Sequence, residues 1–223
     1  MASGIKKLRS RLATPPDPFL VTSRTQQRVV SLVRDAGEDA LVLNVGAGYT
    51  DLGLQVINVD IFDSGTTDVI GSAMALPFPD ATSDLVILQG VLEHVQDATG
   101  TIAESIRVLK PGGLFYTEMP FLQPYHESPI DLRRSTRPGL ATLCAPLTEI
   151  ESGIHIGPAA TLAWFTRELL ARLVSGGSPR IYAKASSLLG WAVFPLRYLD
   201  HFLERLPHLH TVASSCYYLG RKD

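Results

Sequence analysis

A polar segment in the middle of the chain carries the side chains best suited to chemistry. His126 and Asp131 lie in this segment, and Tyr125, Arg133 and Arg134 flank them. A histidine with a pKa near neutrality can take a proton from an attacking hydroxyl. The aspartate could orient that imidazole or bind an acceptor hydroxyl, and the tyrosine and arginines could hold a polar substrate. We therefore predict His126 as the general base, with Asp131 beside it.

Two alternatives stay open for the same segment. Asp131 could pair with an arginine, which would make the segment a salt-bridged loop without catalytic use. His126, Glu127 and Asp131 also supply ligand types that a metal ion such as magnesium could use, although they lack a recognised spacing. Glu127 is otherwise predicted to contact the substrate.

Two further histidines could take part in the same chemistry. His94 lies just after an expected strand and is the rival candidate for the base, with packing and orientation as its other use. His155 lies at the end of an expected strand and precedes Gly157 and Pro158. It is predicted to line the acceptor pocket, with a structural role as the alternative.

A glycine loop follows the first expected strand, residues 40–45. Gly46 and Gly48 permit a tight turn and let a ligand approach the bare backbone. Nicotinamide-binding loops continue to a sixth position that is glycine or alanine, whereas this chain has Asp51 there. The sequence of this loop therefore disfavours a nicotinamide cofactor. Asp60 ends the next expected strand, where a carboxylate can accept both hydroxyls of a ribose.

Three more motifs follow the glycine loop in order. They are Leu-Pro-Phe-Pro-Asp at 76–80, Val-Leu-Glu-His-Val at 91–95 and Leu-Lys-Pro-Gly-Gly at 109–113. The ordered set resembles the class I S-adenosylmethionine-dependent methyltransferases over about residues 40–120. The resemblance implies that the chain is an enzyme with S-adenosyl-L-methionine as its cofactor.

The resemblance also implies a role for each matching position. The glycine loop would pass beneath the methionine part of the cofactor, Asp60 would hold the ribose, the next turn would flank the adenine, and a strand end would face the sulfonium. The residues in these roles are Gly46, Ala47, Gly48, Asp60, Ser72, Ala73, Met74 and Gln89.

One position in the cofactor site departs from the family pattern. Asn44 stands where relatives often have aspartate or glutamate, so an amide would replace a charged contact to the cofactor. Arg24 or Arg28 could supply a charge for the cofactor carboxylate, with a solvated role as the alternative.

The segment after the fifth expected strand indicates the class of acceptor. Residues 119–140 are similar to a methyltransferase subgroup associated with sugar and polysaccharide pathways. We therefore predict an O-methyltransferase for a hydroxyl of a small polar acceptor, preferably a sugar or oligosaccharide. The alternatives are a methyltransferase of a quinone or polyketide, and a cofactor-binding protein without turnover.

Short apolar runs define the elements that must position these residues. Strands are predicted at 40–45, 55–59, 67–70, 85–88, 113–118, 149–156 and 214–220, and helices at 23–35, 99–109 and 158–174. Parallel strands normally need a connection of about a dozen residues or more. The first two connections are shorter, so we predict an α/β, Rossmann-like, mostly parallel sheet with trimmed early crossovers. The helix at 23–35 could cover part of the exposed face.

The ends of the chain differ from the middle in composition. Residues 1–20 form a basic, proline-rich arm, predicted to be a solvated tail rather than a contact with an anionic surface. Residues 21–223 are predicted to form a single domain, with a helical cap at about 158–210. The apolar, aromatic segment 185–206 is predicted to belong to the core, to a lid or to a homodimer face.

Composition excludes several classes of function. Twenty basic and twenty-two acidic residues give a net charge of −2, which offers no field to attract nucleic acid. Two cysteines make neither a disulfide framework nor a cysteine zinc site. Residues 185–196 form the longest uncharged run near the C-terminus, too short for the ~20 residues of a membrane span. With no secretory signal found, we predict a cytoplasmic protein without a transmembrane segment.

Overall fold

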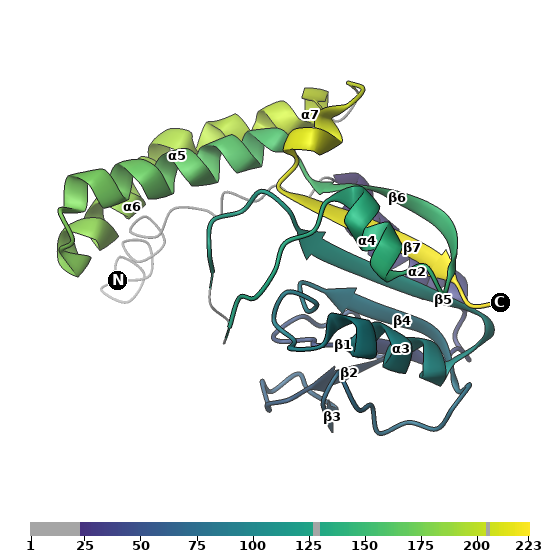
Figure 1. The fold of residues 1–223 in the computed structure, drawn as a ribbon. Helices are drawn as coiled ribbons and strands as arrows, with labels where there is room; N and C mark the ends of the chain where they lie inside the picture. The colour runs from purple at the N-terminus through teal and green to yellow at the C-terminus, as the bar shows by residue number, and fades with distance from the viewer. Residues whose placement is uncertain (1–22, 127–129, 204–205) are drawn as a thin grey trace, which may run out of the picture. The chain divides into compact units, whose positions relative to one another are not determined.

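The computed structural model describes residues 23–126, 130–203 and 206–223, with side chains described from residue 27 onward. The described chain forms two compact units (Figure 1). The sheet unit holds Ser23–Phe121, Tyr125–His155 and Ser215–Asp223, and the helical unit holds Leu122–Pro124 and Ile156–Ser214. The predicted arm over residues 1–20 and Glu127 lie outside the described residues. That residues 21–223 act as one domain remains a prediction.

The sheet has seven strands in the order β3-β2-β1-β4-β5-β7-β6. Neighbours among β1 to β5 pair in parallel, and β7 runs antiparallel to β5. This confirms the predicted Rossmann-like, mostly parallel sheet. The strands are β1 (Val42–Val45), β2 (Val56–Asp60), β3 (Val69–Ile70), β4 (Ser83–Gln89), β5 (Leu109–Pro120), β6 (Thr148–Ile156) and β7 (Ser215–Arg221).

Two hydrophobic clusters cover the two faces of the sheet, because the buried strand residues alternate between them. Leu43 and Val86 pack in one cluster with Ile102 from α3 (Ala98–Val108). Val42 and Val56 pack in the other with side chains of α2 (Ser23–Ala36). Figure 1 shows α3 in front of the sheet and α2 behind it.

The predicted trimming of the early crossovers is also confirmed. Residues 46–55 and 61–68 contain no helix. Instead, Val29 and Val33 of α2 are buried against the sheet and close the face that a crossover helix would otherwise cover. The connections from β1 to β2 and from β2 to β3 are therefore bare loops, and both lie at the site described below.

Two local features differ from the expected elements. The strand expected at 113–118 begins four residues earlier, at Leu109, because the Lys110–Gly113 turn is an irregularity within β5 opposite Ser83–Leu85. Residues 119–140, which are predicted to form a loop on the acceptor side of the site, also contain the start of a helix, α4 (Arg137–Leu143). Thr136 caps this helix by accepting a hydrogen bond of 3.1 Å from the Gly139 N–H.

The helical unit consists of α5 (Pro158–Ser175), α6 (Pro179–Val193), α7 (Asp200–Leu203) and two 3₁₀ turns, η1 (Phe194–Leu199) and η2 (Leu209–Val212). Gly176, with a φ of +53°, ends α5, and Ser178 caps α6. The helix predicted at 158–174 is present, whereas α6 begins earlier than the apolar segment at 185. Asp200 is fully buried and accepts hydrogen bonds of 2.8 and 3.0 Å from the first N–H groups of α5. In the part of the chain that the structure describes, no helix has the length and apolar character to cross a membrane.

Candidate functional site

The glycine loop turns directly off β1 and is held against β2. The N–H groups of Gly46 and Ala47 both donate to the carbonyl oxygen of Val59, at 2.8 and 3.2 Å. Gly46 and Gly48 have φ angles of +69° and +55°, in the left-handed region that glycine adopts without strain. The loop therefore keeps the conformation that exposes backbone at the carboxyl end of β1, where open α/β sheets bind ligands.

Asp60 lies at the end of β2 beside this loop. Its side chain is buried, and its Oδ2 accepts a hydrogen bond of 2.7 Å from the Gly48 N–H. The Phe62 N–H lies 3.4 Å from the other carboxylate oxygen. The contact to Gly48 fixes the carboxylate next to the glycine loop, as a ribose-binding aspartate requires.

The turn predicted to flank an adenine follows β3 and is bonded to the end of β2. The Gly71 N–H donates to the Asp60 carbonyl oxygen at 2.8 Å, which fixes the start of the turn. The Ser72 hydroxyl accepts a bond of 3.2 Å from the Met74 N–H, and Ala73 is buried. The Met74 side chain is about half exposed, so it is accessible to a planar ligand.

The side chain of Asn44 makes hydrogen bonds within the sheet unit. It is buried, and its amide nitrogen donates to Asn58 Oδ1 at 2.9 Å and lies 3.4 Å from the Thr50 carbonyl oxygen. Arg28, considered above for the cofactor carboxylate, pairs with Glu151 at 2.5 Å and lies over the Tyr217 ring. The side chain of Arg24 lies outside the described part. The structure thus gives Asn44 and Arg28 partners within the sheet unit.

A buried carboxylate that the sequence analysis did not single out collects three polar side chains. Glu118, near the end of β5, accepts hydrogen bonds at Oε1 from Gln89 Nε2 (3.1 Å) and from the Tyr116 hydroxyl (2.7 Å). His155 Nε2 lies 3.1 Å from Glu118 Oε2. The available signal was a single carboxylate in an otherwise uncharged strand, Leu114–Pro120.

This buried cluster shifts the proton equilibria of its members. Burial lowers the pKa of His155, although the Glu118 carboxylate opposes that change. Burial and the same carboxylate raise the pKa of Tyr116 well above its usual value. Gln89 is predicted to contact a cofactor and His155 an acceptor. In the structure, both side chains contact the Glu118 carboxylate.

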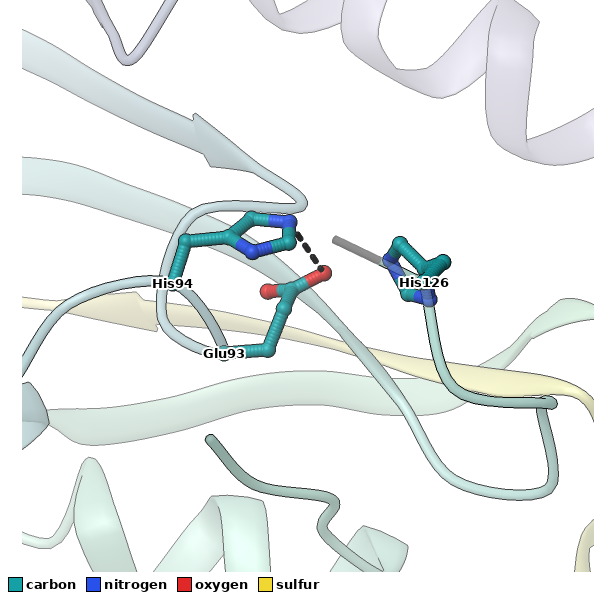
Figure 2. Close-up of side chains that lie close together, drawn as sticks. All are labelled: Glu93, His94 and His126. Atoms are coloured by element: carbon teal, nitrogen blue, oxygen red, sulfur yellow. Dashed lines mark ion pairs between the residues drawn. The ribbon is translucent and has the colours of Figure 1, made fainter. Parts of the chain in front are cut away.

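Glu93, His94 and His126 converge beyond the end of β4 (Figure 2). The Glu93 carboxylate is buried and faces the His94 ring, with Oε1 3.8 Å from Nε2. The rings of His94 and His126 meet edge to face, with centroids 5.4 Å apart. Burial raises the pKa of Glu93 to about 7. The structure thus brings together both histidines predicted as bases and adds a carboxylate that was not predicted.

A backbone contact decides which nitrogen of His94 carries a proton. Nδ1 lies 2.5 Å from the carbonyl oxygen of Ile130. A carbonyl oxygen only accepts hydrogen bonds, so Nδ1 is the protonated nitrogen. In the neutral ring, Nε2 therefore carries the lone pair and can act as a base or as a ligand.

Asp131 pairs with Arg134, as the alternative interpretation of this segment proposed. The two terminal guanidinium nitrogens of Arg134 donate to the two carboxylate oxygens of Asp131, whose side chain is buried. Asp131 Oδ2 also accepts the His126 backbone N–H at 2.8 Å and lies 3.5 Å from His126 Nδ1. Despite burial, the Arg134 guanidinium and the His126 N–H hold the pKa of Asp131 below its usual value. Asp131 thus positions His126, and its buried side chain is closed to an acceptor hydroxyl.

The other residues predicted to bind substrate take different places. Arg133 donates to the carbonyl oxygens of Leu92 (3.3 Å) and Gln96 (2.7 Å) and so braces the turn that carries Glu93 and His94. Tyr125 is largely exposed. In the predicted metal set, Asp131 is engaged by Arg134 and Glu127 is not described. In the described residues, the potential ligands that cluster are Glu93, His94 and His126.

The glycine loop and the histidine cluster lie next to each other in the sheet unit. A side chain on Gly46 would overlap Val91, so the loop packs directly on the turn after β4. The Val91 carbonyl oxygen accepts the His94 N–H at 2.9 Å. A cavity of about 340 Å³ lined by Asp84, Lys110 and Leu114 lies at the start of β4. It is therefore at the opposite end of that strand from this site.

Comparison with known proteins finds similarity over the part of the chain that carries the glycine loop, Asp60 and His94. Residues 44–117 match the family described as a methyltransferase domain. A probable S-adenosylmethionine-dependent methyltransferase of Mycolicibacterium smegmatis is 34% identical over 103 residues, covering 39% of this chain and 40% of the relative. The ubiquinone/menaquinone biosynthesis C-methyltransferase UbiE of a Caulobacter species is 32% identical over 98 residues, covering 43% and 36%. The chain thus spans less than half the length of these curated relatives.

Solved structures share the fold at low sequence identity. The cyclase SpnF superposes with a TM-score of 0.55 at 16% identity, covering 94% of this chain and 86% of the other. A sarcosine dimethylglycine methyltransferase from Galdieria sulphuraria gives 0.55 at 17% identity, covering 94% of each chain. By sequence, residues 44–117 are therefore similar to a methyltransferase domain, and the chain has a Rossmann-like fold found in solved methyltransferases.

Proposed function

We propose that the chain is an S-adenosylmethionine-dependent methyltransferase. The observation that carries the proposal is the arrangement at the ends of β1 and β2, where Asp60 is bonded to Gly48 of an exposed-backbone loop. The match of residues 44–117 to the methyltransferase domain supports the same cofactor. Gly46–Gly48 would lie beneath its methionine part, and Asp60 would bind the ribose.

The acceptor that we propose is a hydroxyl of a small polar molecule, preferably a sugar or oligosaccharide. The acceptor oxygen would attack the methyl carbon as the bond from that carbon to sulfur breaks, leaving S-adenosylhomocysteine. The acceptor proton would pass to a histidine, for which His94 Nε2 and His126 are the candidates. Tyr125 is exposed beside His126 and could contact a sugar ring.

A second acceptor class has an observation of its own in its favour. Curated relatives include quinone C-methyltransferases of Caulobacter species. We therefore keep a quinone-type ring as the alternative acceptor. A quinone ring is methylated at carbon and a sugar at oxygen, so the position of the transferred methyl group separates the two.

A non-catalytic cofactor-binding protein is the alternative of a different class. The cyclase SpnF is among the proteins that share this fold, so the fold alone does not fix the reaction. Binding of S-adenosylmethionine without transfer to sugars, quinols or phenols would support this alternative. Transfer to any of them would exclude it.

We also propose that apolar side chains of the helical unit serve a homodimer, and that the protein is cytoplasmic. Leu188 and Phe202 are 74% and 72% exposed, which is unusual for large apolar side chains of one segment. Light scattering on the wild-type chain and on a Leu188→Ser, Phe202→Ser double variant tests the first point. A dimer that the double variant loses would support it, and a monomeric wild type would contradict it.

A further inference from the structure

Three side chains at the histidine cluster present a set of ligand atoms to one point. One ring nitrogen each from His94 and His126 and a carboxylate oxygen of Glu93 lie within 4.8 Å of one another. Figure 2 shows the side chains approaching from two segments that are distant in sequence. Ligand atoms about 2.1 Å from a tetrahedral ion lie about 3.4 Å apart, so closure on an ion needs only a small side-chain adjustment.

Each histidine has a partner that orients it for this use. His94 Nδ1 donates to the Ile130 carbonyl oxygen, and His126 Nδ1 lies 3.5 Å from the Asp131 carboxylate. Metal-bound histidines typically donate their other ring N–H to a backbone carbonyl or a carboxylate, which fixes the tautomer. The contact to Ile130 leaves the lone pair of His94 on Nε2. For His126, Arg134 Nη2 lies 3.4 Å from Nδ1 and competes with the Asp131 carboxylate for that nitrogen.

Glu93 supplies an independent observation. Its side chain is 3% exposed, and its Oε2 has no hydrogen-bond partner among the described residues. A buried carboxylate oxygen without a partner costs free energy that a cation would recover.

The donor types select the class of ion. Two imidazoles and one carboxylate suit first-row transition ions, whereas magnesium prefers oxygen ligands and water. Catalytic zinc sites with two histidines and one glutamate keep a position open for water or substrate. We infer that Glu93, His94 and His126 form a binding site for a divalent transition ion of the zinc class.

The site differs from the magnesium set considered from the sequence, which used Asp131 and Glu127. Here Asp131 holds His126 instead of binding the ion. An ion at this place would bind an acceptor oxygen and lower its pKa, and that use rests on the proposed function. Binding of the ion does not depend on the proposed methyltransferase function, so the experiment is done without cofactor or acceptor.

The test titrates chelator-treated protein with Zn²⁺ by calorimetry and with Co²⁺ by absorption spectroscopy. We expect one ion per chain, with visible Co²⁺ bands of a four- or five-coordinate site. Glu93→Gln, His94→Ala and His126→Ala are each expected to weaken Zn²⁺ binding by at least about tenfold. The matched control is His201→Ala, which removes an exposed histidine of α7 and should leave the affinity unchanged.

The titration of the wild-type chain tests for the ion site even if a variant fails to fold. No Zn²⁺ or Co²⁺ binding to the wild-type chain, or an octahedral Co²⁺ spectrum that excess Mg²⁺ abolishes, would overturn the inference. So would folded variants of all three ligands that bind Zn²⁺ as the control does. Zinc binding without methyl transfer would leave the site standing and reject only the proposed function.

Discussion

Gly46 of the glycine loop packs directly against Val91 of the turn that follows β4. A Cβ on Gly46 would overlap Val91 Cγ2 and lie 3.2 Å from its Cγ1. Because Val91 also accepts the N–H of His94 through its carbonyl group, this one contact couples the cofactor loop to the histidine cluster. The absence of a side chain at Gly46 therefore allows the glycine loop to pack against the turn that carries His94.

Substitution of Gly46 should accordingly be worse than substitution of Gly48. Both have positive φ angles, which cost a non-glycine residue about 1–2 kcal/mol. Only Gly46→Ala also creates an overlap, worth about 1–3 kcal/mol more. Urea unfolding of Gly46→Ala, Gly48→Ala and the double variant Gly46→Ala, Val91→Ala measures the difference. The double variant should recover part of the loss, and equal losses for the two single variants would contradict the packing described here.

Asp60→Asn should weaken binding of S-adenosylmethionine by tenfold or more. The amide cannot accept two ribose hydroxyls as a carboxylate can, and its NH₂ group would face the Gly48 N–H. Calorimetry measures the affinity, and circular dichroism checks the fold. Asp63→Asn, an exposed aspartate in the loop that follows β2, is the matched control. Unchanged affinity in Asp60→Asn would remove Asp60 from the cofactor site.

The fold was predictable because its signals are local. Continuous apolar runs such as Leu85–Leu88 predict buried parallel strands, and the short stretches after Val45 and Asp60 leave no room for helices. The helix at Arg137–Leu143 also has a local signal, because Thr136 is an N-cap residue and Pro138 lies in the first turn, but the many polar residues and prolines of the segment favour a loop.

The site residues were predictable only where they lie close together in the sequence. The glycine loop and Asp60 are adjacent along two neighbouring strands. By contrast, the partners of His155 and His126 come from distant segments, and no spacing in the sequence predicts Glu118 or Glu93 beside them. Burial of a carboxylate depends on tertiary packing, so both glutamates were missed.

His126→Ala should reduce methyl transfer strongly while leaving cofactor affinity near that of the wild type. A positioned general base contributes about 10²–10⁴-fold to a rate. His94→Ala is made in parallel, because His94 is the other candidate base and lies on the turn that contacts the cofactor loop. The variant that loses activity identifies the base. Full activity in His126→Ala with loss in His94→Ala would assign the base to His94. Full activity in both would exclude histidine catalysis at this cluster.

His155 should make folding stability depend on pH below neutrality. Burial lowers its folded pKa, so in acid the unfolded chain binds a proton that the folded chain does not. Stability is then lost as the pH falls through about 6.5, the unfolded value, by up to about 1.4 kcal/mol per pH unit. Glu93 acts in the opposite sense. Burial raises its pKa in the folded protein to about 7, so its contribution to stability falls as the pH rises from the ordinary value of 4.5 through about 7.

A His155→Gln variant separates the two contributions. Urea unfolding at pH 5, 6 and 7 should show the stability difference between wild type and variant shrinking as the pH falls, because only the wild type carries the histidine. A difference that is constant across this range would mean that His155 keeps an ordinary pKa in the folded protein.

Methyl transfer from labelled S-adenosylmethionine tests the central proposal most directly. The wild-type chain is incubated with tritiated cofactor and pools of mono- and oligosaccharides, quinols and phenols, with and without added Zn²⁺ or Mg²⁺. We expect label in a saccharide oxygen, and its loss in the Asp60→Asn variant. Label only in a quinol or phenol would replace the acceptor but keep the enzyme. Cofactor binding measured in the same samples, with no label in any pool, would contradict the proposal of a methyltransferase for these acceptors.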